Sequence, residues 1–263
     1  MNGLALCSGI AGLDLALQRV VPGYRTVCHV EGEAFAAAVL ARRMEDHQLE
    51  PAPIHGDLTT FDGRPWRGVV DLVSAGYPCQ PFSVAGKRRG ADDERHLWPH
   101  VARVIRDSGP SFVFLENVHG HVRLGLDAVL GDLADLGFDA EWCVLGASDV
   151  GAPHRRKRLF VLAYRDGAEL RLQPGRLCGT GGADQAQSGQ HGEEVADRGQ
   201  WPPPPDDLQA WARVPTDSQP SICGVAHRLP HRLDRLRGLG NGVVPLAAAH
   251  AFRTLAARAL APS

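Results

Sequence analysis

Short apolar runs alternate with stretches of helical periodicity through the first 164 residues. Runs such as residues 4–7 and 112–115 are typical of strands buried between two layers, whereas apolar positions three and four apart predict helices. This alternation predicts an α/β fold in which a doubly wound, mostly parallel sheet carries helices on both faces. The strands are predicted at 4–7, 25–30, 69–75, 111–116, 139–145 and 158–164, and the helices at 13–21, 34–43, 97–107, 124–136 and 246–260.

The pattern changes after residue 164. Residues 165–226 are rich in glycine, glutamine, aspartate and proline, and residues 179–192 are nearly free of apolar side chains. The segment 175–200 fits a small loop-rich module and a disordered insert equally well. We therefore predict a large domain at 1–164, a small second domain at 165–238, and a C-terminal segment at 239–263 that completes the first domain.

Composition narrows the class of protein. The chain has 263 residues, 44% of them apolar, and no apolar run approaches the roughly 20 residues that a membrane helix needs. The N-terminus lacks the basic leader of a signal peptide. Six cysteines are scattered without Cys-x-x-Cys pairs, which argues against a zinc site or a disulfide framework. We expect no metal, no membrane contact, free thiols and a cytoplasmic location.

The basic residues are clustered although the net charge is only −2. The clusters lie at residues 87–89, 155–158 and 227–237. Any one of them alone is typical of a solvated surface. Because each lies beside a candidate site segment, the three together favour contact with a polyanion such as nucleic acid.

A glycine-rich turn follows the first predicted strand and precedes the first helix. Small residues let backbone N–H groups approach a ligand at a helix N-terminus, although many such turns bind nothing. Glu31 ends the second strand about 20 residues on, where an acid usually accepts hydrogen bonds from ribose hydroxyls. Asp57 follows the next apolar stretch and either accepts from an adenine amino group or caps a turn. The turn, Ser8, Gly9, Ile10, Ala11 and Gly12, and the two acids predict an adenosine-containing cofactor.

Cys79 lies between turn-forming residues directly after the predicted strand at 69–75. In open α/β sheets, active sites lie at the edge where the strands end. Pro78 and Pro81 stiffen this loop. A lone cysteine after a strand is more often a small core residue than a nucleophile, so the role of Cys79 depends on its surroundings. Glu116 and Asn117 follow at the end of the next predicted strand, where such a pair is more often a cap or a turn than a catalytic group.

Taken together, these segments resemble the C5-cytosine DNA methyltransferases, in particular compact members of phage or prophage type. The resemblance is carried, in the family's order, by residues 8–12, 76–83, 116–118, 154–158 and 240–245. It implies a fold of the S-adenosylmethionine-dependent methyltransferase type, with a small target-recognition domain at 165–238. It also implies S-adenosyl-L-methionine as cofactor and a monomer that methylates a flipped-out cytosine in double-stranded DNA. A cognate restriction endonuclease, in a bacterial or phage-infected cell, would be a further partner.

The resemblance also implies roles for individual residues. Cys79 would attack cytosine C6, Glu116 would protonate or hydrogen-bond N3, and Arg158 would contact O2, with Arg156 in the same catalytic group. The implied cofactor-binding residues are Ser8, Gly9, Ile10, Ala11, Gly12, Glu31, Asp57, Pro78, Asn241 and Val243. The basic side chains expected to contact DNA are Lys87, Arg88, Arg89, Arg228, Arg232 and Arg235.

The chain departs from the family pattern in several positions. Cys7 stands where a phenylalanine often stacks on adenine, and Ala11 replaces a usual glycine, which is a mild change. His154 stands where glutamine is usual, and Gly242 replaces serine or alanine. Two alternative functions remain open, which are methylation of cytosine in tRNA and DNA binding without catalysis. Retention of Cys79, Glu116 and Arg158 argues against the second.

Overall fold

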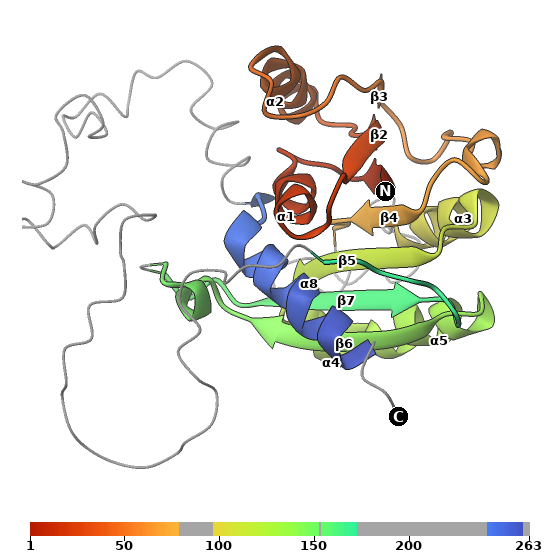
Figure 1. Cartoon of the computed structure of the whole chain (residues 1–263), viewed down its shortest axis with the longest axis vertical. Coiled ribbons are helices and arrows are strands. Elements are labelled where there is room, and N and C mark those ends of the chain that lie inside the picture. The colour runs from red at the N-terminus through yellow and green to blue at the C-terminus, as the bar shows by residue number, and fades with distance from the viewer. Residues whose placement is uncertain (79–96, 153, 173–240, 260–263) are drawn as a thin grey trace, which may run out of the picture.

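A single seven-stranded sheet organises the computed structural model, which describes residues 1–78, 97–152, 154–172 and 241–259. The strands follow the spatial order β3-β2-β1-β4-β5-β7-β6 (Figure 1). Only β7 runs against its neighbours, and the other neighbouring pairs from β3 to β5 are parallel. The sheet is therefore mostly parallel, as predicted. Its strands are β1 (Asn2–Leu6), β2 (Arg25–Val30), β3 (Ile54–His55), β4 (Leu72–Ala75), β5 (Phe112–Val118), β6 (Asp139–Leu145) and β7 (Arg158–Tyr164).

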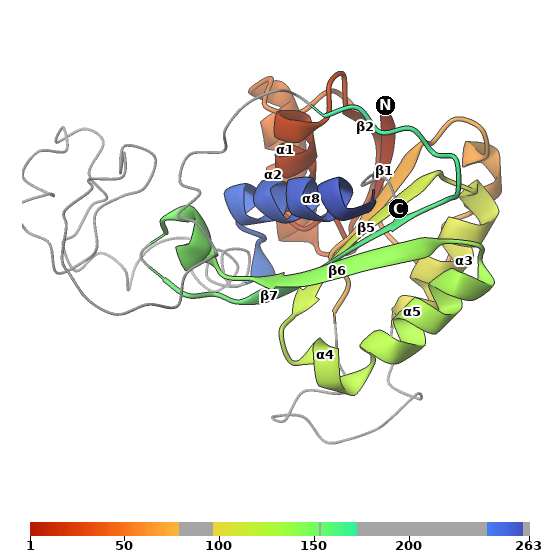
Figure 2. The ribbon, with the colours of Figure 1, turned by 60° about the horizontal axis from the view of Figure 1, so that its bottom comes forward.

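Helices cover both faces of the sheet, which confirms the doubly wound fold. Helices α1, α2 and α8 lie on one side, and α3, α4 and α5 lie on the other (Figure 2). Their bounds are α1 (Gly12–Val20), α2 (Ala34–Glu45), α3 (Trp98–Ser108), α4 (His121–Leu124), α5 (Leu126–Asp135) and α8 (Pro245–Ala259), with short 3-10 turns η1 (Arg64–Trp66) and η3 (Ala147–Val150).

Alternate residues of the central strands fill two separate cores, as the period of two along a strand requires. On β5, Val113 points into the core beneath α3 and α5, whereas Phe114 points into the core beneath α1 and α8. The Phe114 ring meets Phe252 of α8 edge-on at 5.0 Å between centroids and stacks on Phe160 at 6.0 Å. The sheet is thereby held between two apolar layers, and its strand ends are left free to build a site.

Helix α8 contributes to the same core as α1, although it lies far away in the sequence. Its buried alanines and Leu255 pack with Leu17 and Val20 of α1. The predicted C-terminal helix thus packs directly on the first part of the fold. The division of the chain at residues 164 and 239 stays a prediction, because residues 173–240 lie outside the described residues.

Several element ends differ from the prediction by one or two residues, and three larger differences stand out. Strand β4 begins at Leu72 rather than at Val69, whose side chain is 44% exposed. The helix expected at 124–136 is α5, which begins at Leu126 because Gly125, with a φ of 151°, separates it from the short helix α4. The short strand β3 was not predicted. Within the described ranges, none of the helices is long and apolar enough to cross a membrane.

Candidate active site

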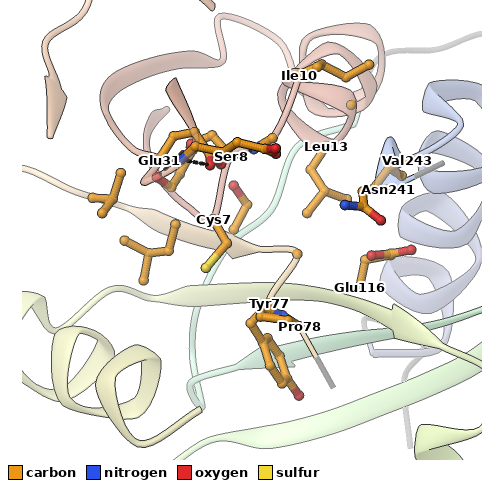
Figure 3. Close-up of a pocket in the computed structure, with 18 of the residues that line it drawn as sticks. Cys7, Ser8, Ile10, Leu13, Glu31, Tyr77, Pro78, Glu116, Asn241 and Val243 are labelled. Carbon is orange, nitrogen blue, oxygen red and sulfur yellow. Dashed lines mark hydrogen bonds between the residues drawn. The ribbon is translucent and has the colours of Figure 1, made fainter. Parts of the chain in front are cut away.

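The carboxyl ends of β1, β2, β4 and β5 meet at one edge of the sheet, and a cleft of about 770 Å³ opens there. Figure 3 shows side chains from these strand ends and from the segment before α8 around the same opening. Eleven of the predicted site residues line this cleft, namely Ser8, Gly9, Ile10, Gly12, Glu31, Asp57, Pro78, Glu116, Arg158, Asn241 and Val243. The fold therefore brings nine of the predicted cofactor-binding residues together with Glu116 and Arg158.

The remaining predicted residues form two groups. Ala11 and Arg156 are described but do not line the cleft. The proposed nucleophile and the basic residues expected on DNA lie outside the described residues, namely Cys79, Lys87, Arg88, Arg89, Arg228, Arg232 and Arg235.

The loop between β1 and α1 forms one wall of the cleft, and its backbone is unusual. Cys7, Gly9 and Ala11 have positive φ values of 49°, 52° and 67°. The Ala11 N–H donates to the Ser8 carbonyl at 2.9 Å, and the Ser8 N–H donates to Val30 O at 3.2 Å. These bonds fix a tight turn, which brings backbone N–H groups to the start of α1.

Ala11 carries strain at the position where the resemblance expects glycine. It caps α1 in the left-handed conformation and is fully buried. A left-handed conformation costs a residue with a Cβ about 1–2 kcal/mol. Ala11 belongs to the turn at residues 8–12 that is predicted to bind a cofactor, so hydrogen bonds around this turn must compensate for the strain.

Replacing Ala11 with glycine should leave the free energy of unfolding nearly unchanged, within about 0.5 kcal/mol. Relief of about 1–2 kcal/mol of strain offsets the lost methyl burial and the greater entropy of the unfolded chain. The matched control is Ala16→Gly on α1, which is equally buried but helical, and it should destabilise by about 1.5–2 kcal/mol. Urea unfolding of both variants measures the difference, and equal losses would show that Ala11 is unstrained.

Glu31 holds the same turn from the end of β2. Its Oε2 accepts a hydrogen bond of 2.6 Å from the Gly9 N–H, drawn as a dashed line in Figure 3, and its Oε1 accepts one of 2.8 Å from the Glu33 N–H. A carboxylate has about four lone-pair positions, so two remain for a ligand in the cleft. Glu31 is thus both a support of the turn and a candidate acceptor for ligand hydroxyls.

Asp57 caps a turn and also lines the cleft. Its Oδ1 accepts from the Thr59 N–H at 2.8 Å and from the Thr59 hydroxyl at 2.7 Å. These bonds to the charged form lower the pKa of Asp57. Asp57 therefore caps a turn, as one of the two alternatives expected. Its contact with an adenine amino group stays a prediction.

At the other end of the cleft, Glu116 and Arg158 form a buried ion pair. Because β7 runs antiparallel to β5, its first residue Arg158 lies opposite Val118 at the site edge. The Arg158 Nε lies 3.0 Å from Glu116 Oε1, and the two side chains are 21% and 9% exposed. Burial raises the pKa of Glu116 to about 7, although the charges of Arg158 and Arg156 act to lower it. This carboxyl can therefore carry a proton near neutral pH.

Asn117 fixes the chain just before Cys79 in the sequence. Its Nδ2 donates to the Tyr77 carbonyl at 3.1 Å, and its Oδ1 accepts from the Val118 N–H at 2.8 Å. The Tyr77 ring packs on Trp98 with centroids 5.2 Å apart. The end of β5 therefore both supplies Glu116 and anchors the residues that lead to Cys79.

Arg156 reaches a different part of the site from Arg158. Its Nη2 donates to the Gly242 carbonyl at 2.6 Å. The neighbouring Val243 lies so close to Gly12 that a Cβ on Gly12 would be 2.7 Å from Val243 O. Arg156 and Gly12 thus hold the segment before α8 against the cleft. This contact favours a positioning role for Arg156, and its place in the catalytic group stays a prediction.

Several lining residues were not predicted as site residues. Cys7 lines the cleft as a neutral thiol, because burial and then the charge of Glu31 raise its pKa to about 12. Asp14 and Asn117 also line it. A sequence signal existed for both, because Asp14 interrupts the apolar face of α1 and Asn117 follows Glu116 directly. Among the described residues, no cluster of histidine, cysteine and acidic side chains could hold a metal ion.

The chain is similar to a known protein family and to individual members of it. A family profile described as C-5 cytosine-specific DNA methylase matches residues 1–192. The chain is 34% identical over 169 residues to the type II methyltransferase M.NgoMIV of Neisseria gonorrhoeae, which covers 63% of this chain and 52% of that protein. It is also 34% identical over 165 residues to the type II methyltransferase M.CviJI of Paramecium bursaria Chlorella virus IL3A, covering 62% and 42%. The chain therefore spans about half the length, or less, of these relatives.

Solved structures agree with the fold. A mutant of Spodoptera frugiperda DNMT2 superposes with a TM-score of 0.53 at 22% identity, over 63% of this chain and 50% of that one. A putative DNA modification methyltransferase encoded within an Escherichia coli prophage gives 0.51 at 26% identity, over 63% and 47%. The first shows the likeness of fold alone. Since the family profile covers well over half of the residues, including the strand ends that line the cleft and the Glu116–Arg158 pair, the chain belongs to the C-5 cytosine-specific DNA methylase family.

Proposed function

We propose that this protein transfers a methyl group from S-adenosyl-L-methionine to C5 of a cytosine in double-stranded DNA. The observation that carries the proposal is the buried Glu116–Arg158 pair, with the pKa of Glu116 raised to about 7, in the cleft that residues 76–78 also line. Membership of the family supports the reaction type. A carboxyl that is protonated near neutral pH suits a reaction that must protonate a base.

The cleft suits an adenosine-containing cofactor. Its volume of about 770 Å³ lies in the range of small-molecule sites. Glu31 would accept from the ribose hydroxyls and Asp57 from the adenine amino group, while the turn at 8–12 would contact the rest through its backbone. When bound, S-adenosylmethionine supplies an electrophilic methyl group. Asn241 and Val243 would close the cleft from the segment before α8.

The chain's own residues would supply the nucleophile and the proton. The Cys79 thiolate forms a bond to cytosine C6, and the C5–C6 electron pair becomes available at C5. Glu116 donates its proton to N3, where charge develops, and Arg158 donates hydrogen bonds to O2. After methylation of C5, a base would remove the C5 proton, the Cys79–C6 bond would break, and N3 would return its proton to Glu116. The thiolate is thereby regenerated.

The target base must leave the stack to reach this edge of the sheet. We assign recognition of the flanking sequence to residues 165–238 and contact with phosphates to the basic side chains at 87–89 and 228–235. In this proposal the enzyme acts as a monomer alongside its DNA, in the cytoplasm of a bacterial or phage-infected cell. A cognate restriction endonuclease would cut the same sequence when it is unmethylated.

Bisulfite sequencing of DNA from cells that express the chain tests the proposal. We expect protected cytosines in one short sequence context and none in cells that carry the empty vector. With purified protein, labelled methyl groups should be transferred to duplex DNA and not to tRNA. Transfer to tRNA alone would establish the alternative substrate, and binding of DNA without transfer to either would establish a non-catalytic relative.

Neutralising Lys87, Arg88 and Arg89 should weaken DNA binding and flatten its salt dependence. Each phosphate contact releases counterions, so loss of three contacts should reduce the slope of log K against log salt by about 2–3. Fluorescence anisotropy with a labelled duplex at several salt concentrations measures the slope. A triple glutamine variant with the wild-type slope would exclude these side chains from phosphate contact.

A further inference from the structure

A histidine beneath the cofactor turn has no place in the mechanism above. His29 lies on β2, two residues before Glu31, and is fully buried. Its Nδ1 lies 3.2 Å from the hydroxyl oxygen of Ser8, the residue that lines the cleft at the start of the turn. The His29 ring therefore contacts the turn through the side chain of Ser8.

The hydrogen-bond pattern determines which ring nitrogen carries the proton. The Ser8 hydroxyl donates its hydrogen to the Ala5 carbonyl at 3.0 Å. Its oxygen then accepts from His29, which assigns the ring proton to Nδ1, since the other tautomer would leave a buried Nε2–H without a partner among the described residues. A continuous chain of donors runs from His29 through Ser8 to the backbone of β1.

The other ring nitrogen shows that packing alone does not explain a histidine here. Nε2 is buried without a hydrogen-bond partner among the described residues. An unsatisfied buried nitrogen is unfavourable, and an apolar side chain of similar size would avoid that cost. Burial lowers the pKa of His29 despite the opposing charge of Asp14, so the ring is neutral. The contact with Ser8 is the polar interaction that offsets this cost.

The turn needs such support because its backbone conformation is unfavourable. Cys7 and Ala11 adopt positive φ values on either side of Ser8. Glu31 fixes Gly9 through its N–H, and the backbone of Val30 fixes Ser8 through its N–H. His29 contacts the side-chain oxygen of Ser8, whose hydroxyl hydrogen is donated to Ala5. The last two residues of β2, His29 and Val30, and the following Glu31 therefore each contact a group of the turn.

We propose that His29 is a positioning residue for the cofactor site, which holds Ser8 and the turn in the shape that receives the cofactor. The inference rests on the proposed function, because it takes the cleft to be the S-adenosylmethionine site. It assigns the role to the Nδ1 donor and not to the bulk or charge of the ring.

Two substitutions separate the donor from the bulk of the ring. In His29→Asn the amide nitrogen occupies the place of Nδ1 and can donate to Ser8, whereas His29→Leu fills the space without a donor. We expect His29→Leu to weaken binding of S-adenosylhomocysteine about tenfold in calorimetry and His29→Asn to stay within about threefold of the wild type. The loss should appear in KM for S-adenosylmethionine rather than in kcat.

Ser8→Ala completes a double-mutant cycle. It should weaken binding about as much as His29→Leu, and the double variant should lose little more, since both remove the same contact. Equal affinity of His29→Leu and wild type, equal losses in the leucine and asparagine variants, or additive losses in the cycle would overturn the inference. Wild-type protein that binds no S-adenosylhomocysteine would instead overturn the proposed function.

Discussion

Replacing Cys79 with serine should reduce methyl transfer by at least about 10³-fold and leave cofactor binding unchanged. A serine hydroxyl is far less nucleophilic than a thiolate, and removal of a covalent nucleophile abolishes the pathway that depends on it. Radiolabelled transfer to duplex DNA measures the first effect, and calorimetry with S-adenosylhomocysteine measures the second. Residual transfer above about a tenth of the wild-type rate would contradict covalent catalysis.

A substrate that cannot complete the reaction tests the covalent bond directly. When cytosine carries fluorine at C5, no proton is available for removal, so the Cys79–C6 bond should persist and shift the protein in a denaturing gel. The serine variant should form no such adduct. Cys143→Ser is the matched control, because Cys143 lies on the distant strand β6 with its pKa raised to about 11 by burial. The control should form the adduct as the wild type does.

The sequence predicted the two antiparallel strands to the residue, although only β7 has an apolar run along almost its whole length. The observed bounds of β6 and β7 coincide with the predicted ones, and α1 and α8 differ by about one residue. Val69 was wrongly added to β4 because apolar character alone cannot show that a side chain remains in solvent. Strand β3 has only two residues, too few for any periodicity to appear.

The site was harder to predict than the fold because its contacts join distant segments. The motifs identified Glu116 and Arg158 separately, yet their contact depends on the reversed direction of β7, which no local pattern reveals. Long-range contacts also separate the two arginines of one motif, since Arg156 reaches Gly242 while Arg158 reaches Glu116. The support that His29 gives to Ser8 has no motif at all and follows only from the register of β1 and β2.

Replacing Glu116 with glutamine should lower kcat by about 10²–10⁴-fold, the usual contribution of a general acid. Glutamine keeps the size of the side chain and an oxygen that accepts from Arg158, but it has no acidic proton to give to N3. Because the pKa of Glu116 is raised to about 7, wild-type turnover should fall as the pH rises through that value. Steady-state rates from about pH 6 to 9 measure both effects, and a glutamine variant with the wild-type rate would exclude Glu116 as the acid.

The same substitution should change how stability depends on pH. The pKa of Glu116 is about 7 in the folded protein against an ordinary 4.5, so the folded state holds this proton more tightly than the unfolded chain. The bound proton therefore contributes fully to the free energy of unfolding below about pH 4.5, and this contribution is lost as the pH rises to about 7. The loss amounts to about 3 kcal/mol at most. Between about pH 4.5 and 7, urea unfolding should show that the free energy of unfolding of the wild type falls relative to that of Glu116→Gln.

A carboxylate with the opposite shift provides the control for that measurement. Hydrogen bonds from Arg64 lower the pKa of Asp62 to about 2, so Asp62 is ionised in the folded and unfolded states alike above about pH 5. The difference between Asp62→Asn and wild type should therefore be constant from about pH 5 to 8, where that of Glu116→Gln changes. If both variants follow the wild-type curve in parallel, the proton on Glu116 is not held by the folded cleft. Because the same proton is the one proposed to reach cytosine N3, that result would remove the general acid from the mechanism as well.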